Sequence, residues 1–121
     1  MDDERVWAFE RDLWTGGEDV YRRSIDESCL MALPEPPFIL SGSEAIAAVT
    51  DTPRWSQVDF SEAQVSRPQE GMIVIAYKAH ASLGDRKYEA WCTSTYRRLG
   101  DEEWRVIQHQ QAVQPLAQHL R

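Results

Sequence analysis

Apolar residues recur at helical spacing near the start of the chain and alternate with polar residues over much of its second half. Val6, Phe9 and Leu13 share one helical face, which predicts a helix over residues 3–13. The other predicted elements are a short helix over 17–24, strands over 28–33 and 38–40, a helix over 41–51, and strands over 57–65, 72–82, 88–98 and 104–111. Capping-box spacing marks the starts of the second and third helices, at Thr15–Glu18 and Ser41–Glu44. This order of elements indicates an α+β fold.

The two longest predicted strands are joined by Leu83-Gly84-Asp85-Arg86, in which Gly84-Asp85 suits a two-residue turn with positive φ. Counting outward from that turn fixes which residues face each other. One face pairs Ala81 with Tyr88, Ala79 with Ala90, Tyr77 with Cys92, and Ile75 with Ser94. The other face pairs His80 with Glu89 and Lys78 with Trp91. The first face is predicted to point inward, because a slip of one residue would bury the charged face instead.

Glu10 is the only carboxylate that helical periodicity places toward the interior, because it falls between Val6 and Trp14 on the apolar arc. Two interpretations are open. Glu10 is either a carboxylate at the helix edge that pairs with an arginine, or a buried acid that faces a cavity.

The last predicted strand, residues 104–111, ends in four polar side chains, Gln108, His109, Gln110 and Gln111. Neighbours in a strand point to opposite faces, so one alternate pair is expected to face inward. The length of the preceding turn does not fix which pair this is.

Composition narrows the classes of function. The net charge of −7 argues against nucleic acid and membrane partners, because both need clustered lysine and arginine. The acidic start of the chain lacks the apolar core of a signal peptide, and no apolar run approaches a membrane span, so we expect a cytoplasmic protein. Cys29 and Cys92 are expected to be buried thiols, with a disulfide as the alternative. A chain of 121 residues fits one domain, with its core over residues 4–113 and a tail over 114–121.

Several segments together resemble a known superfamily: residues 9–14, residues 41–46, Tyr77, residues 93–98, and the strand 104–111 that begins with a tryptophan. They resemble the nuclear transport factor 2-like superfamily (also classed as cystatin-like), which includes ketosteroid isomerase, SnoaL-like cyclases and the association domain of calcium/calmodulin-dependent kinase. The similarity covers nearly the whole chain and is closest to small stand-alone bacterial members, most of which have no assigned activity. It implies N-terminal helices packed on a strongly curved antiparallel sheet, a cone-shaped pocket, and a homodimer formed through the sheet.

The resemblance also implies how the last strand faces. In the kinase association domain, pocket-facing residues of this strand lie an odd number of steps after the tryptophan, which here places inward Ile107, His109 and Gln111. Several of the pocket positions in that domain hold arginines that bind a carboxylate. The corresponding residues here are Ala79, Ser94 and Gln111, so carboxylate binding is not implied.

The leading functional hypothesis is a homodimeric domain that binds a small, mostly apolar, neutral molecule. The residues expected to line the pocket or orient the ligand are Trp14, Trp55, Tyr77, Cys92, Ser94, His109 and Gln111. The alternative is an isomerase or lyase that transfers a proton, which requires Tyr77, His109 and Glu10 to converge. A pure oligomerisation module is disfavoured by the polar residues expected inside. No cofactor is expected, and the histidines lack metal-site spacing.

Overall fold

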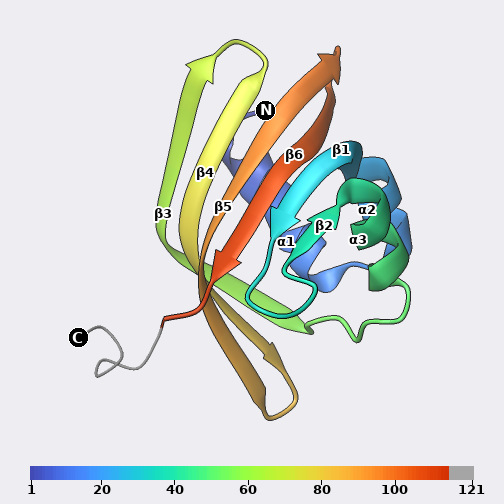
Figure 1. The fold of residues 1–121 in the computed structure, drawn as a ribbon. Helices are drawn as coiled ribbons and strands as arrows, with labels where there is room; N and C mark the ends of the chain where they lie inside the picture. Colours follow the sequence, from blue (N-terminus) through green and yellow to red (C-terminus); the bar gives the residue numbers. More distant parts are fainter. Residues whose placement is uncertain (115–121) are drawn as a thin grey trace, which may run out of the picture.

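The computed structural model describes residues 1–114, in which three helices pack against one side of a six-stranded sheet (Figure 1). The helices are α1 (Asp3–Thr15), α2 (Glu18–Ser24) and α3 (Gly42–Val49). The strands are β1 (Ile25–Ala32), β2 (Ile39–Ser41), β3 (Gln57–Gln69), β4 (Met72–Leu83), β5 (Arg86–Gly100) and β6 (Glu103–Ala112). Every helix and strand predicted from the sequence is present, with its ends shifted by a few residues. Most of the expected tail, residues 115–121, lies outside the described part of the chain.

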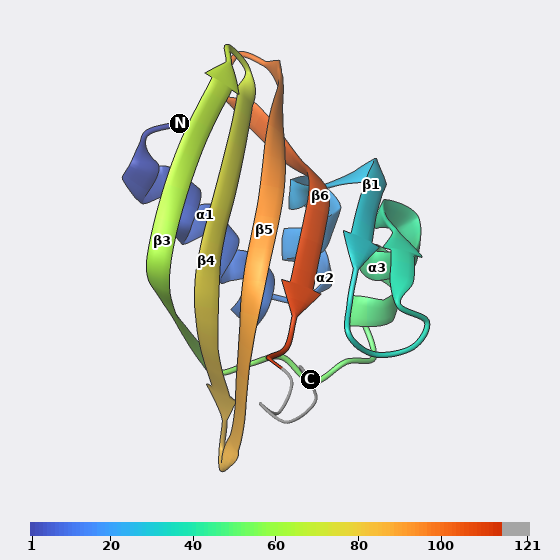
Figure 2. The ribbon, with the colours of Figure 1, turned by 60° about the vertical axis from the view of Figure 1, so that its left-hand side comes forward.

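The strands lie in the order β2-β1-β6-β5-β4-β3, and the sheet curves around α1 (Figures 1 and 2). Strands β3 to β6 form consecutive antiparallel pairs, whereas β1 runs parallel to β6. The expectation of an antiparallel sheet is therefore wrong at this pairing, and the sheet is mixed. Hairpin turns set the direction of consecutive strands only, so they leave the direction of β1 relative to the distant β6 undetermined.

The hairpin of β4 and β5 has the predicted register. Gly84 in its turn has φ 59°, and all four inward pairs form, including Tyr77 with Cys92. On the outer face, Nζ of Lys78 lies 5.2 Å from the ring centre of Trp91. The turn residues and the alternation of apolar and charged positions were therefore sufficient to fix this part of the sheet.

Strand β6 changes the face that it presents partway along its length. Val106 and Gln108 pair with adjacent residues of β5, so Ile107 between them is an extra residue in a β-bulge. Trp104 and Val106 are buried before the bulge, and His109 is buried after it. The prediction that Ile107 faces inward is wrong, because its side chain is half-buried and lies outside the hydrophobic core.

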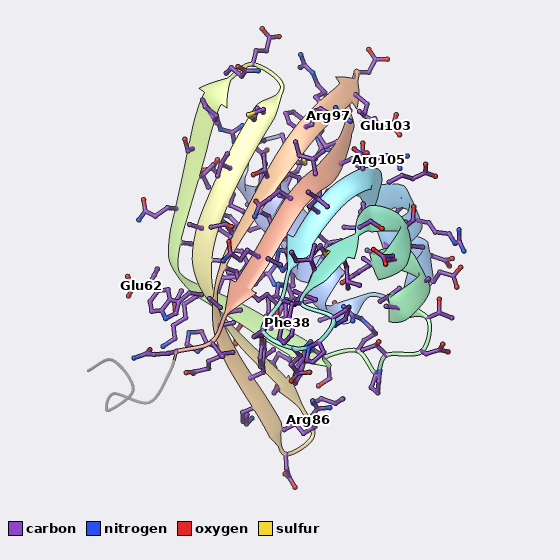
Figure 3. The ribbon with its side chains drawn as sticks, viewed as in Figure 1. Phe38, Glu62, Arg86, Arg97, Glu103 and Arg105 are labelled. Carbon is purple, nitrogen blue, oxygen red and sulfur yellow. The ribbon has the colours of Figure 1, made fainter. Side chains whose placement is uncertain are left out.

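Strand β3 is interrupted by a bulge. Its pairing with β4 shifts between Ser61 and Gln64, and Glu62 has a φ of 54°. Figure 3 shows Glu62 where β3 bends. A bulge of this kind bends a strand and increases its twist, which allows the sheet to curve over the helices.

One of the two predicted capping boxes is present. The Ser41 hydroxyl accepts from the backbone N–H of Glu44, and the Glu44 carboxylate accepts from the backbone N–H of Ser41. The box predicted at Thr15–Glu18 is wrong, because α1 continues to Thr15 and the Thr15 hydroxyl donates to the carbonyl of Arg11. Gly17 precedes α2 instead and provides no side-chain cap.

Cys29 and Cys92 are free and buried, as predicted, and burial raises the pKa of each thiol to about 12. Within residues 1–114, no helix combines the length and the apolar content that crossing a membrane requires.

Candidate functional site

Glu10 lies on the face of α1 that packs against the concave side of the sheet, and 0% of it is exposed. Its carboxylate accepts hydrogen bonds from the hydroxyls of Tyr77 (2.5 Å), Ser94 (2.6 Å) and Tyr96. No lysine or arginine among residues 1–114 forms an ion pair with it. The interpretation of Glu10 as an edge carboxylate paired with an arginine is therefore wrong, and the helical periodicity correctly placed it inside.

The two phenols at Glu10 are neutral donors. Burial raises the pKa of Tyr77 and of Tyr96 well above 10, and the charge of Glu10 adds to both shifts. The indole N–H of Trp14 donates to the Tyr77 oxygen over 3.0 Å, so this tyrosine connects the carboxylate to the next turn of α1.

A chain of hydrogen-bonding groups leads from Glu10 to β6. The Ser94 hydroxyl oxygen lies 2.7 Å from Nδ1 of His109, which is itself 3.6 Å from a Glu10 oxygen. Nε2 of His109 lies 3.1 Å from the amide nitrogen of Gln111. The Gln111 amide oxygen accepts from the Tyr88 hydroxyl over 2.8 Å. Burial lowers the pKa of His109, although the charge of Glu10 opposes this shift. The lowered pKa keeps the imidazole neutral near pH 7.

A cavity of about 210 Å³ lies between the three helices, β1 and β6. Its deeper walls are the buried side chains of Leu13, Trp14, Ile25, Met31, Ala45, Val49, Val106 and His109. Gln111, Arg54, Trp55 and Thr52 line it nearer the surface, where they are half-buried or exposed. The lining is therefore mainly apolar, with His109 as its deep polar group.

The two ends of the sheet differ in character. Figure 3 shows Arg97, Glu103 and Arg105 together at the end of β5 and β6 that lies far from Phe38. Arg105 pairs with Glu103 over 3.1 Å at that end. Toward the opposite end, the backbone N–H of Leu33, which lines the cavity, donates to the carbonyl of Phe38.

The residues proposed from the sequence as a binding site divide into two layers. Four of them line the cavity: Trp14, Trp55, His109 and Gln111. Tyr77, Cys92 and Ser94 are buried and do not line it, and neither does the catalytic candidate Glu10. Tyr77, His109 and Glu10 therefore converge in one network, of which only His109 reaches the cavity.

Two residues of the site were missed from the sequence. Tyr96 has the same strand parity as Ser94, so alternation alone would have placed it on the inward face of β5. Arg54 lies in the irregular segment before β3, where no periodicity indicates its direction. Its guanidinium donates to the backbone carbonyls of Leu13 (2.7 Å) and Gly16 (2.7 Å), at the end of α1.

A second polar cluster lies on the outer face of the sheet. The Ser61 hydroxyl is 2.8 Å from Nε2 of His80, and Nδ1 of His80 is 2.8 Å from Glu89. Glu89 is exposed and also lies 3.7 Å from Nζ of Lys78, so water and a cation compete for its carboxylate. Within residues 1–114, no three His, Cys, Asp or Glu side chains are grouped closely enough to hold a metal ion. The cavity is therefore the stronger candidate site.

No protein-family model matches the sequence, and no curated protein is significantly similar to it. A candidate ketosteroid isomerase from Parabacteroides distasonis has a TM-score of 0.77 at 18% identity, over 91% of this chain and 86% of that chain. A nuclear transport factor 2-like protein from Cytophaga hutchinsonii has a TM-score of 0.73 at 14% identity, over 94% and 100% of the two chains. The association domain of calcium/calmodulin-dependent kinase II from C. elegans has a TM-score of 0.69 at 17% identity, over 91% of each chain. Such low identities establish a shared fold and leave the activity open.

The depressed pKa of His109 predicts a loss of stability in mild acid. The unfolded chain binds a proton at this position more readily than the folded chain, so the contribution of neutral His109 is fully present above its usual pKa of 6.5 and is lost as the pH falls below that value. We expect the free energy of unfolding in urea to decrease between pH 7.5 and pH 5.5 by more in the wild type than in His109→Gln. Gln110→Ala removes an exposed side chain of β6 that carries no titratable group, so it is the control and should keep the wild-type slope. Equal slopes for the wild type and His109→Gln would contradict the prediction.

Proposed function

We propose that this chain, which has the nuclear transport factor 2-like fold, binds a small, mostly apolar, neutral molecule in the cavity between its helices and sheet. The observation that carries the proposal is the cavity itself, whose apolar walls enclose about 210 Å³ with one polar side chain deep inside. Protein interiors are normally close-packed, so a domain that served only for oligomerisation would gain stability by filling this space.

The volume limits the size of the ligand. An apolar cavity of about 150 Å³ is known to hold benzene, so about 210 Å³ suits a molecule of one or two rings. A four-ring steroid is too large to be enclosed. We therefore do not propose a steroid ligand for this cavity, although one structural neighbour is a candidate ketosteroid isomerase.

His109 and Gln111 are the groups that we propose to orient the ligand, because both line the cavity and carry polar side-chain atoms. Trp14 and Trp55 supply flat apolar walls, and the Trp55 ring stacks on Tyr88 with a centroid distance of 5.5 Å. Tyr77 and Ser94 act from behind the wall through the network that holds His109. Cys92 is buried behind the wall and forms a ladder pair with Gln111.

Filling the cavity should weaken binding. Ala45 on α3 is buried and lines the cavity, whereas Ala47 on the same helix is exposed and does not. We expect naphthalene and indole to raise the melting temperature of the wild type and to bind it in a calorimetric titration. Ala45→Phe should weaken this binding at least about tenfold, which corresponds to about 1.4 kcal/mol, and Ala47→Phe should leave it unchanged. Equal affinities of the two variants would place the binding elsewhere, and an absence of any binding to the wild type would refute the proposal.

We also propose that two copies associate through the outer face of the sheet. One structural neighbour is an association domain, and Trp91 on the outer face is 43% exposed, which is unusual for so large an apolar side chain. Its ladder partners are Lys78 on β4 and Ala112 on β6, and Thr93 and Gln110 occupy the next positions of β5 and β6 on the same face.

Sedimentation velocity tests this association. The wild type should sediment as a dimer at micromolar concentration, and Trp91→Arg should shift it to monomer, because a second cation would then be buried beside Lys78, the ladder partner of this position on β4. Leu99→Arg, at the distant end of β5, is the matched control and should stay dimeric. A wild type that sediments only as a monomer would remove the dimer from the proposal.

A second candidate function is proton transfer of the isomerase or lyase type. It is favoured by the position of His109, which lies between the cavity and the buried Glu10, with Ser94 joining the two. A carboxylate behind an imidazole orients it and stabilises its protonated form, as in the bases of many hydrolases. In this arrangement His109 is the base that touches the substrate, and Glu10 and Tyr77 are positioning residues.

Hydrogen–deuterium exchange tests for proton transfer without knowledge of the natural substrate. Cyclopent-2-enone and cyclohex-2-enone fit the volume limit and carry acidic C–H groups. We expect an active enzyme to accelerate their exchange in D₂O, and His109→Gln to slow it by about 100-fold or more. Exchange at the buffer rate for a ketone that binds in the cavity would rule out this function and leave the binding proposal intact.

A further inference from the structure

We infer that the ligand donates a hydrogen bond to Nε2 of His109, so that the cavity selects one- or two-ring molecules with a hydroxyl or N–H group over molecules of the same shape without one. The inference rests on the proposed binding function and narrows its ligand class. It follows from counting the hydrogen atoms available along the chain of contacts from Trp14 to Tyr88.

The indole of Trp14 determines the direction of hydrogen bonding at Tyr77. An indole N–H can only donate, so the bond from Trp14 uses the Tyr77 oxygen as its acceptor. The single hydrogen of the Tyr77 hydroxyl is therefore directed at Glu10. Tyr96 has no other partner in the network and also donates to Glu10, which makes the carboxylate the common acceptor of the cluster.

The hydrogen bonds of Ser94 determine which nitrogen of His109 carries the proton. Ser94 has one hydroxyl hydrogen and lies 2.6 Å from the Glu10 oxygen that also accepts from Tyr77, so it donates to Glu10. Its oxygen must then accept from Nδ1 of His109 at 2.7 Å, which requires a hydrogen on Nδ1. Burial favours the neutral ring by lowering the pKa of His109. A neutral imidazole has one N–H hydrogen, and here that hydrogen is on Nδ1. Nε2 therefore carries a lone pair.

In the free protein, the amide group of Gln111 faces that lone pair. The Gln111 amide oxygen accepts from the Tyr88 hydroxyl, which turns the amide NH₂ group toward Nε2 of His109 at 3.1 Å. Both His109 and Gln111 line the cavity, and Gln111 is half-buried, so its amide can turn to water when a ligand arrives. A ligand hydroxyl or N–H group can take its place at Nε2. A ligand that presents only a lone pair or a C–H group there leaves a buried acceptor unsatisfied.

Thr52 and Gln111 carry acceptor oxygens nearer the surface, and the remaining polar groups of the wall do not offer an acceptor equivalent to Nε2 of His109. The Tyr21 hydroxyl donates to the carbonyl of Leu13 and accepts from Arg54. Arg54 has only donors, and the indole nitrogen of Trp14 is committed to Tyr77. Nε2 of His109 is thus the side-chain acceptor in the deeper wall of the described cavity, and it sets the polarity that the ligand must match.

Two pairs of probes of matched shape test the inference. Indole and benzofuran differ by an N–H group in place of an ether oxygen, and phenol and fluorobenzene differ by a hydroxyl in place of fluorine. We expect the wild type to bind indole and phenol at least about tenfold more tightly than their partners, as measured by calorimetry. His109→Leu should bind both members of each pair with similar affinity. Met31→Leu changes the wall without touching the network and is the matched control, which should keep the wild-type preference.

Three outcomes overturn the inference. Equal binding of both members of each pair to the wild type overturns it and leaves the proposed binding function standing. A preference that survives in His109→Leu also overturns it, because another group then recognises the donor. Binding of neither member of any pair overturns both the inference and the proposed function.

The tautomer provides a test that does not depend on a folded His109→Leu protein. Two-bond ¹H–¹⁵N correlations of the wild-type ring should show a protonated Nδ1 and an unprotonated Nε2 in the free protein. Addition of indole should shift the Nε2 resonance, and benzofuran should shift it less. A proton on Nε2 in the free protein would overturn the inference.

Discussion

The burial of Glu10 under the sheet is the interaction on which the rest of the structure depends. A carboxylate removed from water costs several kcal/mol unless its oxygens are hydrogen-bonded. Glu10 meets this requirement with three hydroxyl groups, one from β4 and two from β5. These bonds fix both the rotation of α1 about its axis and its position along the sheet. Leu13 and Trp14, one turn further on, are thereby directed into the wall of the cavity.

The same carboxylate gives a direction to the polar groups between the core and the cavity. Each hydroxyl in the network has one hydrogen, and the acceptor at Glu10 determines where each hydrogen points. Ser94 transmits this direction to His109, and His109 transmits it to Gln111. The polar character of the cavity wall is therefore set by a residue that does not touch the cavity. A fully satisfied network of this kind is rigid, which suits a group that must hold one tautomer.

The sequence predicted the parts of the molecule that depend on local chemistry and periodicity. Gly84 and the alternation of charged and apolar residues fixed the hairpin register, and the helical arc of α1 placed Glu10 inside. The parallel pairing of β1 with β6 was not predicted, because it joins strands separated by most of the chain. Ile107 was misplaced because a bulge reverses parity without any glycine or proline to mark it. His109 was still placed inward, by resemblance to a family that shares the fold.

The hydrogen bonds of Arg54 explain why this cation, which lines the cavity, is compatible with a neutral ligand. An isolated guanidinium beside an apolar cavity would favour a carboxylate ligand. Here Nε and one terminal nitrogen of Arg54 donate to backbone carbonyls at the end of α1, and that nitrogen also donates to the Tyr21 hydroxyl. The carbonyls at the end of a helix carry partial negative charge, and a cation placed there satisfies them. The positive charge of Arg54 is thus engaged by α1, the imidazole of His109 is neutral, and the deeper wall offers no formal charge to a ligand. Affinity in such a cavity comes from apolar contact, and discrimination comes from the single acceptor that Glu10 orients.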